Sequence, residues 1–165
     1  MIILGIDPAL RNTGWGIIRA HQNKLHYIAC GSFSVKANLA LEQRLLRINM
    51  ELAHIINQIN PDHVAIEETF MNKNAKTCLL LGHARGAALL TVSLASIPVF
   101  EYAARLVKKS VVGVGKADKE QVQQMVRYLL PSAIIDSHDA ADALAIAICH
   151  SLHAKHAHLT KALTT

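Results

Sequence analysis

The sequence opens with Met1-Ile-Ile-Leu-Gly-Ile-Asp7-Pro8, an uninterrupted apolar run that ends in an acidic residue and a proline. A short run without polar residues is typical of a strand in the middle of a sheet, because both of its faces are buried. The dipeptide Asp7-Pro8 then indicates a turn. The stretch therefore predicts a central strand over residues 1–6, with a carboxylate at its carboxyl end.

Two more strands are predicted directly after the first. Residues 13–20 and 25–35 have strand character, and His21-Gln22-Asn23-Lys24 between them is short enough for a hairpin. A long helix follows, with Asn38 as its predicted N-cap and apolar residues at helical spacing. Asn60-Pro61 ends this helix, because proline cannot continue the backbone hydrogen bonds.

The second half of the chain alternates between helices and strands. The patterns predict strands and helices at these positions: strands over 63–68 and 97–102, helices over 74–93, 119–130 and 139–153. Strands joined by short links form an antiparallel meander, whereas strands joined through helices run parallel. We therefore expect an α/β fold with a five-stranded mixed sheet flanked by helices. This order is compatible with the ribonuclease-H-like architecture.

Length and composition restrict the class of protein. The chain has 165 residues, of which 52% are hydrophobic and 18% charged, so a mainly disordered chain is excluded. We predict a single domain over 1–153 and a flexible basic tail over 154–165. Three cysteines without a C-x-x-C pair indicate reduced thiols and a cytoplasmic protein. Residues 78–94 are apolar but include His83 and Arg85, so we expect a buried helix and no membrane partner.

Acidic residues stand at unusual places in these elements. Asp7 and the pair Glu67-Glu68 follow apolar strands, and Asp139 and Asp142 share one face at the start of an apolar helix. Ligand sites in such sheets lie beyond the carboxyl ends of the strands, so we expect the carboxylates to converge there. Alternation puts Glu67 and Glu68 on opposite faces, and periodicity alone leaves open which of them points inward.

Converging carboxylates need a counter-charge. Two of them ~4 Å apart repel by roughly 4 kcal/mol at an effective dielectric constant of 20. Oxygen ligands suit Mg²⁺, with Mn²⁺ as a substitute, and two such ions about 3.5–4 Å apart could hydrolyse a phosphodiester. Each acid also has a structural interpretation: Asp7 as a turn residue, Glu67 as an exposed charge and Asp139 as a partner of the helix dipole.

Basic residues gather in one stretch before the last two predicted helices. Residues 105–119 hold five Lys or Arg and one Asp, in a chain whose net charge is +5. Glycines interrupt this stretch, which favours phosphate binding over a merely solvated surface. Four histidines near the C-terminus lack the spacing of a zinc site, and we expect a solvated helix end there: His150, His153, His156 and His158.

Motifs spread along the chain resemble one family, the RuvC Holliday-junction resolvases. The resemblance extends to about His153, and its motifs appear in this order: Gly5-Ile6-Asp7-Pro8, Thr13-Gly14-Trp15-Gly16, Ile66-Glu67 followed by Phe70, Phe100-Glu101-Tyr102-Ala103-Ala104-Arg105, Val111-Val112-Gly113-Val114-Gly115, and Asp139-Ala140-Ala141-Asp142-Ala143-Leu144-Ala145. The opening Asp motif alone would also fit actin-like kinases. Those proteins need a second such domain, for which this chain is too short.

The resemblance implies a homodimeric Mg²⁺-dependent endonuclease of ribonuclease-H-like fold, with two ions in each active site. It implies symmetric nicks in opposed strands of four-way junction DNA, leaving 5′-phosphate and 3′-hydroxyl ends during recombination and repair. A RuvA–RuvB branch-migration complex is the implied partner. The implied catalytic and metal-binding residues are Asp7, Glu67, Asp139 and Asp142, which favours Glu67 over Glu68. The implied DNA-binding residues are Phe70, Lys73, Lys108 and Lys119.

Several alternatives stay open at this point. The chain could be another ribonuclease-H-like nuclease with a different nucleic-acid substrate, or a junction-binding module without catalysis, although a pure binder gains nothing from four clustered acids. Phe70 alone would indicate a core anchor, whereas the resemblance places it where it stacks on an unpaired base. Some relatives use His at the third acidic position. The spacing to Asp142 favours Asp139 there and leaves the role of His138 open.

Overall fold

A five-stranded mixed sheet forms the centre of the protein. The computed structural model describes residues 1–22, 24–68 and 74–162, and for 155–162 only the course of the main chain. β1 (Ile2–Asp7), β2 (Asn12–His21) and β3 (Lys24–Ser34) form the antiparallel meander, and β4 (His63–Glu67) and β5 (Val99–Tyr102) join in parallel. The order β3-β2-β1-β4-β5 puts the first strand at the centre. The predicted fold class is confirmed.

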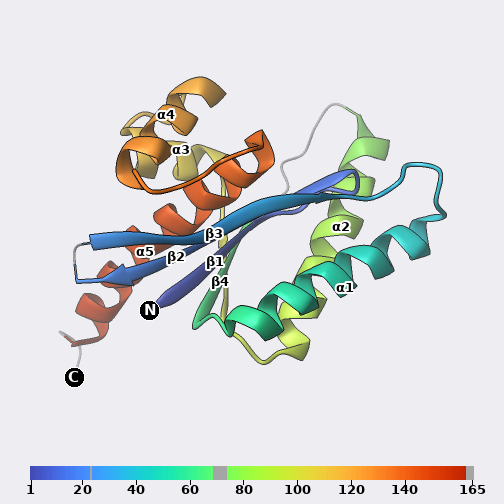
Figure 1. Ribbon diagram of the computed structural model, residues 1–165, viewed down its shortest axis with the longest axis horizontal. Helices are drawn as coiled ribbons and strands as arrows, with labels where there is room; N and C mark the ends of the chain where they lie inside the picture. Colours follow the sequence, from blue (N-terminus) through green and yellow to red (C-terminus); the bar gives the residue numbers. More distant parts are fainter. Residues whose placement is uncertain (23, 69–73, 163–165) are drawn as a thin grey trace.

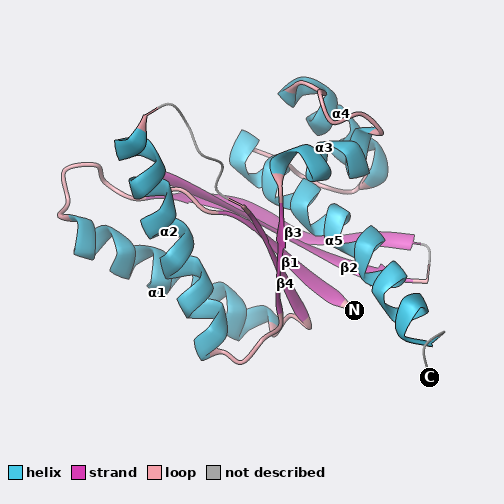
Figure 2. Ribbon diagram, turned by 180° about the vertical axis from the view of Figure 1, so that it is seen from behind, coloured by secondary structure: helices cyan, strands magenta, loops and turns pink. Residues whose placement is uncertain are grey.

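Helices cover both faces of this sheet (Figure 1). α1 (Leu41–Ile59) and α2 (Ala75–Leu94) lie on one face, and α3 (Ala104–Val112), α4 (Lys119–Leu129) and α5 (His138–Ala162) lie on the other. Seen from behind, in Figure 2, α5 lies along the strands and the pair α3–α4 sits beyond it. The result is a sheet between two helical layers.

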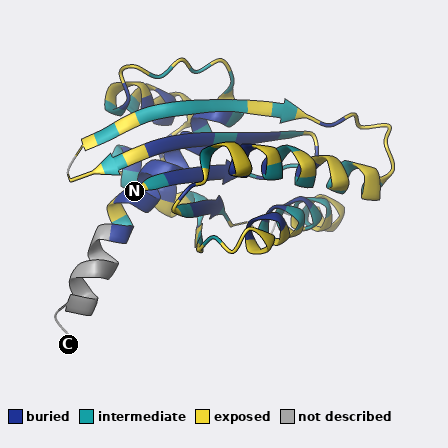
Figure 3. Ribbon diagram, turned by 60° about the horizontal axis from the view of Figure 1, so that its bottom comes forward, coloured by how far each residue is buried: buried dark blue, intermediate teal, exposed yellow. Residues whose placement is uncertain are grey.

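Side-chain alternation divides the interior into two hydrophobic cores. In β1, Ile3 belongs to the core under α5, whereas Leu4 and Ile6 belong to the core under α1 and α2. The α5 helix is buried on nearly all sides from residue 143 to residue 151 (Figure 3), because the sheet covers one side and α3 and α4 cover the other. A helix enclosed in this way is apolar all round, as α5 is over residues 143–149.

The helix boundaries differ from the predictions in three places. α1 begins at Leu41 after Ala40, which makes no side-chain cap, so the prediction of Asn38 as N-cap was wrong. α3 was not predicted at all, because basic residues interrupt its short apolar pattern. It is an amphipathic helix in which Val107 and Val111 are buried. α5 begins at His138 and continues to Ala162, past the expected end at residue 153. The flexible tail stays a prediction.

α2 is not the fully buried helix that was expected. Its buried residues are confined to one side: Ala84, Ala88, Thr91 and Val92. Three leucines elsewhere on α2 are exposed: Leu79 by 63%, Leu90 by 59% and Leu94 by 73%. In the described part of the chain, α2 is the one helix that is long and apolar enough to cross a membrane, by length and composition alone. Arg85 of this helix forms an ion pair with Glu101 of β5, so α2 packs on the sheet.

Candidate active site

Two of the predicted acidic residues end neighbouring strands on the same face of the sheet. β1 and β4 run parallel and pair as far as Ile6 and Ile66, so Asp7 and Glu67 follow side by side. Ile3 and Ala65 belong to the core under α5, and alternation puts Asp7 and Glu67 on that face too. Glu68 lies beyond β4 and is exposed. The structure thus places Glu67, and not Glu68, beside Asp7.

Glycines allow α5 to approach this edge of the sheet. Gly14 pairs with Asp7 in the β1–β2 ladder. A Cβ atom on Gly14 would lie 2.0 Å from the carbonyl oxygen of Asp139, and one on Gly5 would lie 2.1 Å from that of Ala143. No side chain fits in these gaps, so the α5 backbone lies directly on the strands. The close approach brings the start of α5 over Asp7.

The first turn of α5 carries the other two acids. The Ser137 hydroxyl accepts a hydrogen bond from the backbone N–H of Ala140 at 3.1 Å and so caps the helix. Asp139 lies in the first turn, where the helix dipole favours a negative charge. Asp142 follows three residues later and is half-buried. All four predicted carboxylates therefore gather at one end of the α5 face.

Burial raises the pKa values of three of these acids, and repulsion between the acids adds to the effect. Burial raises the pKa of Asp7 to about 6, with further increases from Asp142 and Asp139. Burial also raises the pKa of Glu67 to about 7, helped by Asp7 and Asp142. Burial is again the main reason why the pKa of Asp142 is raised. The cluster holds more negative charge than its surroundings neutralise.

Two predicted DNA-binding lysines border the cluster. Lys119, the first residue of α4, places its Nζ atom 3.5 Å from Oδ2 of Asp142 and offsets part of the rise that burial causes in the pKa of that acid. A capping box between Asp118 and Gln121 fixes the start of α4 and hence the position of this lysine. Lys108 comes from α3 and lowers the pKa of Glu67. The helix that the sequence analysis missed therefore supplies one of the two cations.

His138 lies next to the carboxylates and contacts a residue that the sequence analysis did not single out. Its Nδ1 atom meets the side-chain amide of Gln123, a buried polar residue of α4. His138 also lowers the pKa of Asp142, as the smallest of several effects. Since Lys119 and Gln123 are one turn apart on α4, this helix contacts both Asp142 and His138. The burial of a glutamine becomes evident only in the folded chain.

The donor atoms of the cluster suit a hard divalent cation. In the described ranges, no three His, Cys, Asp or Glu side chains are placed to hold one ion by themselves. Mg²⁺ does not require such a cage, because it keeps several waters and takes one or two carboxylates together with substrate phosphates. The raised pKa values of Asp7 and Glu67 mark the negative charge that a cation would offset. The residues therefore fit a hard divalent cation whose coordination substrate would complete.

Two predicted DNA contacts, Phe70 and Lys73, lie outside the described residues. The chain leads toward them directly from the cluster, since Glu67 is the last residue of β4. The backbone N–H of Glu68 donates a hydrogen bond to the carbonyl oxygen of Tyr102 at 2.9 Å, which holds the end of this strand against β5.

Comparison with known proteins gives a consistent result. Residues 3–150 match the family described as crossover junction endodeoxyribonuclease RuvC. The chain is 54% identical to the crossover junction endodeoxyribonuclease RuvC of Methylorubrum extorquens strain PA1 over 151 residues, which cover 92% of this chain and 80% of that protein. It is 51% identical to the protein of the same name from Bartonella henselae, with coverages of 92% and 89%.

Solved structures with the same fold bind or process junctions. The structure described as T. thermophilus RuvC in complex with Holliday junction substrate matches with a TM-score of 0.89 and 30% identity, over 95% of this chain and 96% of that one. The yeast mitochondrial Holliday junction resolvase Ydc2 matches with a TM-score of 0.64 over 93% and 82% of the two chains. At 12% identity, the second match concerns the fold alone.

Proposed function

The chain belongs to the crossover junction endodeoxyribonuclease RuvC family and is a Holliday-junction resolvase, and we propose that the carboxylate cluster at the start of α5 is its catalytic centre. The proposed catalytic and metal-binding residues are Asp7, Glu67, Asp139 and Asp142. One observation carries this assignment. Acids from β1, β4 and α5 converge at one edge of the sheet, where burial, and after it their mutual repulsion, raises the pKa values of Asp7 and Glu67.

The proposed reaction is hydrolysis of a phosphodiester in junction DNA. When bound, divalent ions would supply an activated water and stabilise the charge on the leaving oxygen. Asp7 and Glu67 hold the site rigidly, because each ends a strand in the middle of the sheet. Lys119 offsets part of the charge of Asp142 and lies where an anionic backbone would approach. The expected products carry 5′-phosphate and 3′-hydroxyl ends, as the family resemblance implies.

The identity of the ion is the finer part of the proposal. Nucleases of this family are metal-dependent. We infer Mg²⁺, with two ions in each site and Mn²⁺ as a substitute, because the cluster offers only carboxylate oxygens. Four carboxylates can balance two divalent charges and still leave places for water and phosphate oxygens. This charge balance also supports the whole set of acids rather than a single pair.

The DNA-binding proposal rests on the lysines that border the cluster. Lys108 and Lys119 lie on separate helices and both lower the pKa of Glu67, so their charges reach the proposed catalytic centre. Positive side chains at such a site contact phosphates without reading the base sequence. Phe70 and Lys73 belong to the same proposal through the family resemblance, with Phe70 stacking on an unpaired base of the junction.

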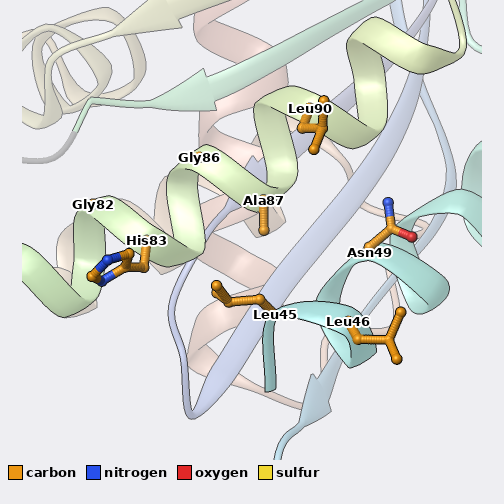
Figure 4. A pocket seen from close by; sticks show the side chains of 8 residues that line it. All are labelled: Leu45, Leu46, Asn49, Gly82, His83, Gly86, Ala87 and Leu90. Atoms are coloured by element: carbon orange, nitrogen blue, oxygen red, sulfur yellow. The ribbon is translucent and has the colours of Figure 1, made fainter. Parts of the chain in front are cut away.

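We further propose that the protein acts as a homodimer that pairs through α1 and α2. A groove of about 450 Å³ runs between these helices (Figure 4), and most of the residues that line it are apolar or glycine: Leu45, Leu46, Asn49, Gly82, His83, Gly86, Ala87 and Leu90. Leu46 and Leu90 are 57% and 59% exposed. The buried Nδ1 atom of His83 has no hydrogen-bond partner among the described residues. A second copy would cover this apolar surface.

Two catalytic centres in one particle would account for symmetric nicks in opposed strands. A homodimer with two-fold symmetry presents the same surface twice, as the symmetry of a four-way junction requires. The RuvA–RuvB partnership and the cytoplasmic location stay predictions from the family resemblance. The geometry of the carboxylate cluster supports neither of these two predictions.

Cleavage of defined DNA tests this function. Labelled four-way junction and linear duplex of the same sequence are incubated with the protein, in Mg²⁺ and in EDTA. We expect paired nicks in the junction with Mg²⁺, binding without cleavage in EDTA, and far less cleavage of the duplex. Equal cleavage of both substrates would favour a ribonuclease-H-like nuclease of another specificity. Binding of the junction without cleavage under any divalent ion would favour a non-catalytic module.

A further inference from the structure

Three polar side chains that play no part in the carboxylate cluster are hydrogen-bonded to one another on the α5 face. The hydroxyl of Tyr102 lies 2.7 Å from Nδ1 of His150, and Nε2 of His150 lies 2.9 Å from Nδ1 of His63. His150 is 0% exposed, so the expectation of a solvated helix end was wrong for this residue, and Tyr102 is 8% exposed. The ring of Phe100 lies against both imidazoles, with centroid distances of 4.4 Å to His150 and 4.9 Å to His63. These groups are therefore fixed in direction and largely shielded from water.

Each of these three side chains belongs to an element that carries an acid of the carboxylate cluster or pairs with a strand that does. His63 begins β4, which ends in Glu67, and His150 lies on α5 after Asp142. Tyr102 is the register partner of Glu67 in the β4–β5 ladder. Neighbouring strands are ≈4.8 Å apart and register partners share a face, so the ring of Tyr102 flanks the side chain of Glu67.

The two sides of the sheet hold α5 in different ways. On β1 and β2, glycines let the α5 backbone lie directly on the strands, as at Gly14 and Asp139. The contacts of α5 with β4 and β5 are less extensive than those with β1 and β2. Apolar contacts are non-directional, whereas a hydrogen bond fixes both a distance and an orientation. Between α5 and the β4–β5 side, the hydrogen bonds of His150 to Tyr102 and His63 are such directional contacts.

The protonation states suit this arrangement. Burial, with smaller effects from His63 and His153, lowers the pKa of His150 to about 4, so its ring is neutral near pH 7. Burial raises the pKa of Tyr102 to about 12, so the hydroxyl keeps its proton. A neutral imidazole has one donor and one acceptor nitrogen, and here each nitrogen meets one partner. Loss of either partner leaves a buried polar atom without a hydrogen bond.

We propose that Tyr102, His150 and His63 are positioning residues that set the distance between Glu67 on β4 and the aspartates on α5. The inference rests on the proposed catalytic role of those acids. The three residues are not among the proposed metal-binding or DNA-binding residues. They act by holding β4 and β5 in one place relative to α5, so that acids from the two parts of the site could hold metal ions at the same phosphate.

Two matched hydroxyl deletions test the proposal. Tyr102→Phe removes the hydroxyl that meets His150. Tyr27→Phe removes another tyrosine hydroxyl, which lies 3.6 Å from Sγ of Cys30 and 3.5 Å from the carbonyl oxygen of Ile134 and does not meet His150. Each variant is compared with the wild type for melting temperature, junction affinity in EDTA, and single-turnover cleavage with saturating protein and Mg²⁺.

We expect Tyr102→Phe to cleave about tenfold more slowly, with junction affinity within about twofold of the wild type, because small misplacements at a reacting centre cost up to ~10²-fold. Tyr27→Phe should keep the wild-type rate even if it lowers the melting temperature as much. Equal cleavage by the two variants would overturn the inference. If the wild type itself does not cleave junctions, the proposed function fails instead, so the two failures are distinguishable.

A double mutant tests whether the residues act as one unit. His63→Gln is chosen because His63 is half-buried, so its replacement disturbs the core less than a change at His150. Residues that act through one shared contact give non-additive effects. We expect the double variant, Tyr102→Phe with His63→Gln, to lose no more activity than the worse single variant. Losses that multiply would mean that the two side chains act separately, against the proposal.

Discussion

On the α5 face of the sheet, glycines bring a helix backbone into contact with the strands, whereas on the α1–α2 face branched side chains separate the layers. Gly5, Gly14 and Gly16 all face α5, and a Cβ on any of them would lie within 3 Å of helix backbone atoms. The other face presents Leu4, Ile6 and their neighbours to α1 and α2. Both faces belong to the same five strands. Because side chains alternate between the two faces of a strand, one sequence presents glycines to α5 and branched side chains to α1 and α2.

The difference indicates how one sheet can separate chemistry from assembly. Close approach on the α5 face brings acids from a helix and two strands within range of one another, in a partly buried site where charge effects are strong. The α1–α2 face carries exposed leucines and a groove, which suit burial against another surface. We therefore expect substitutions on the α5 face to stop the reaction, and those on the α1–α2 face to affect assembly.

The largest effect is expected in the carboxylate cluster, at one end of the α5 face. Asp7→Asn removes one carboxylate of the cluster and lowers cleavage about 10³-fold, because metal-ion catalysis contributes several kcal/mol and each ~1.4 kcal/mol is tenfold in rate. Junction binding should persist or improve, since a negative charge near phosphates is lost. Single-turnover cleavage and binding assays measure both. Substantial nicking by the variant in Mg²⁺ would exclude a catalytic role for Asp7.

Two alanine substitutions compare the faces directly. Gly14→Ala puts a methyl group about where the Asp139 carbonyl lies, so α5 must shift. We expect a loss of stability of at least 1–3 kcal/mol and roughly 10²-fold slower cleavage. Gly86→Ala adds a methyl group with no atom within 4 Å, so a change within about 1 kcal/mol is expected. Chemical denaturation and cleavage rates check both. Similar losses in the two variants would contradict the contrast between the faces.

The proposed dimer surface gives the next prediction. Leu90→Glu places a charge in the groove between α1 and α2, at a residue that is 59% exposed, so the single chain should still fold. We expect sedimentation to show mainly monomer and paired nicks in one junction to become rare. Tyr128→Glu is the control, because Tyr128 is an exposed residue of α4 on the other face. A dimer that survives Leu90→Glu would place the interface elsewhere.

The smallest effect concerns pH. The folded-state pKa of Glu67, about 7, lies above its ordinary value of 4.5, so the folded protein holds a proton that the unfolded chain has released. Stability from this group is therefore lost as pH rises through 7. Without divalent ions, we expect the free energy of unfolding to fall by about 1 kcal/mol from this group between pH 6.5 and 8. The histidine His150, with a pKa of about 4, stays neutral in this range.

Glu67→Gln supplies the comparison for the pH measurement, because it removes the titrating group and keeps the size of the side chain. Denaturant titrations of both proteins at each pH isolate the contribution of this acid. Addition of Mg²⁺ at pH 8 should restore stability to the wild type more than to Glu67→Gln. Identical pH profiles for the two proteins would contradict the raised pKa.

Much of this architecture could be predicted from the sequence. The apolar run before Asp7, the short hairpin link and Asn60-Pro61 each follow a local rule, and the strands and most helices lie close to the predicted positions. The spacing of Asp139 and Asp142 likewise placed both on one face of a helix. α3 escaped prediction because its helical pattern is only nine residues long and is interrupted by lysines.

Local pattern by itself determined the type of most elements, their order along the chain and the acidic residues that are candidates for the site. It could do so because strand and helix periods depend on neighbours along the chain. Only the tertiary structure decided which face each residue serves. It placed Glu67 toward α5 and Glu68 outside the strand, left one side of α2 exposed, and brought Tyr102, His63 and His150 into contact. Those outcomes depend on contacts between residues far apart in sequence, which no local period encodes.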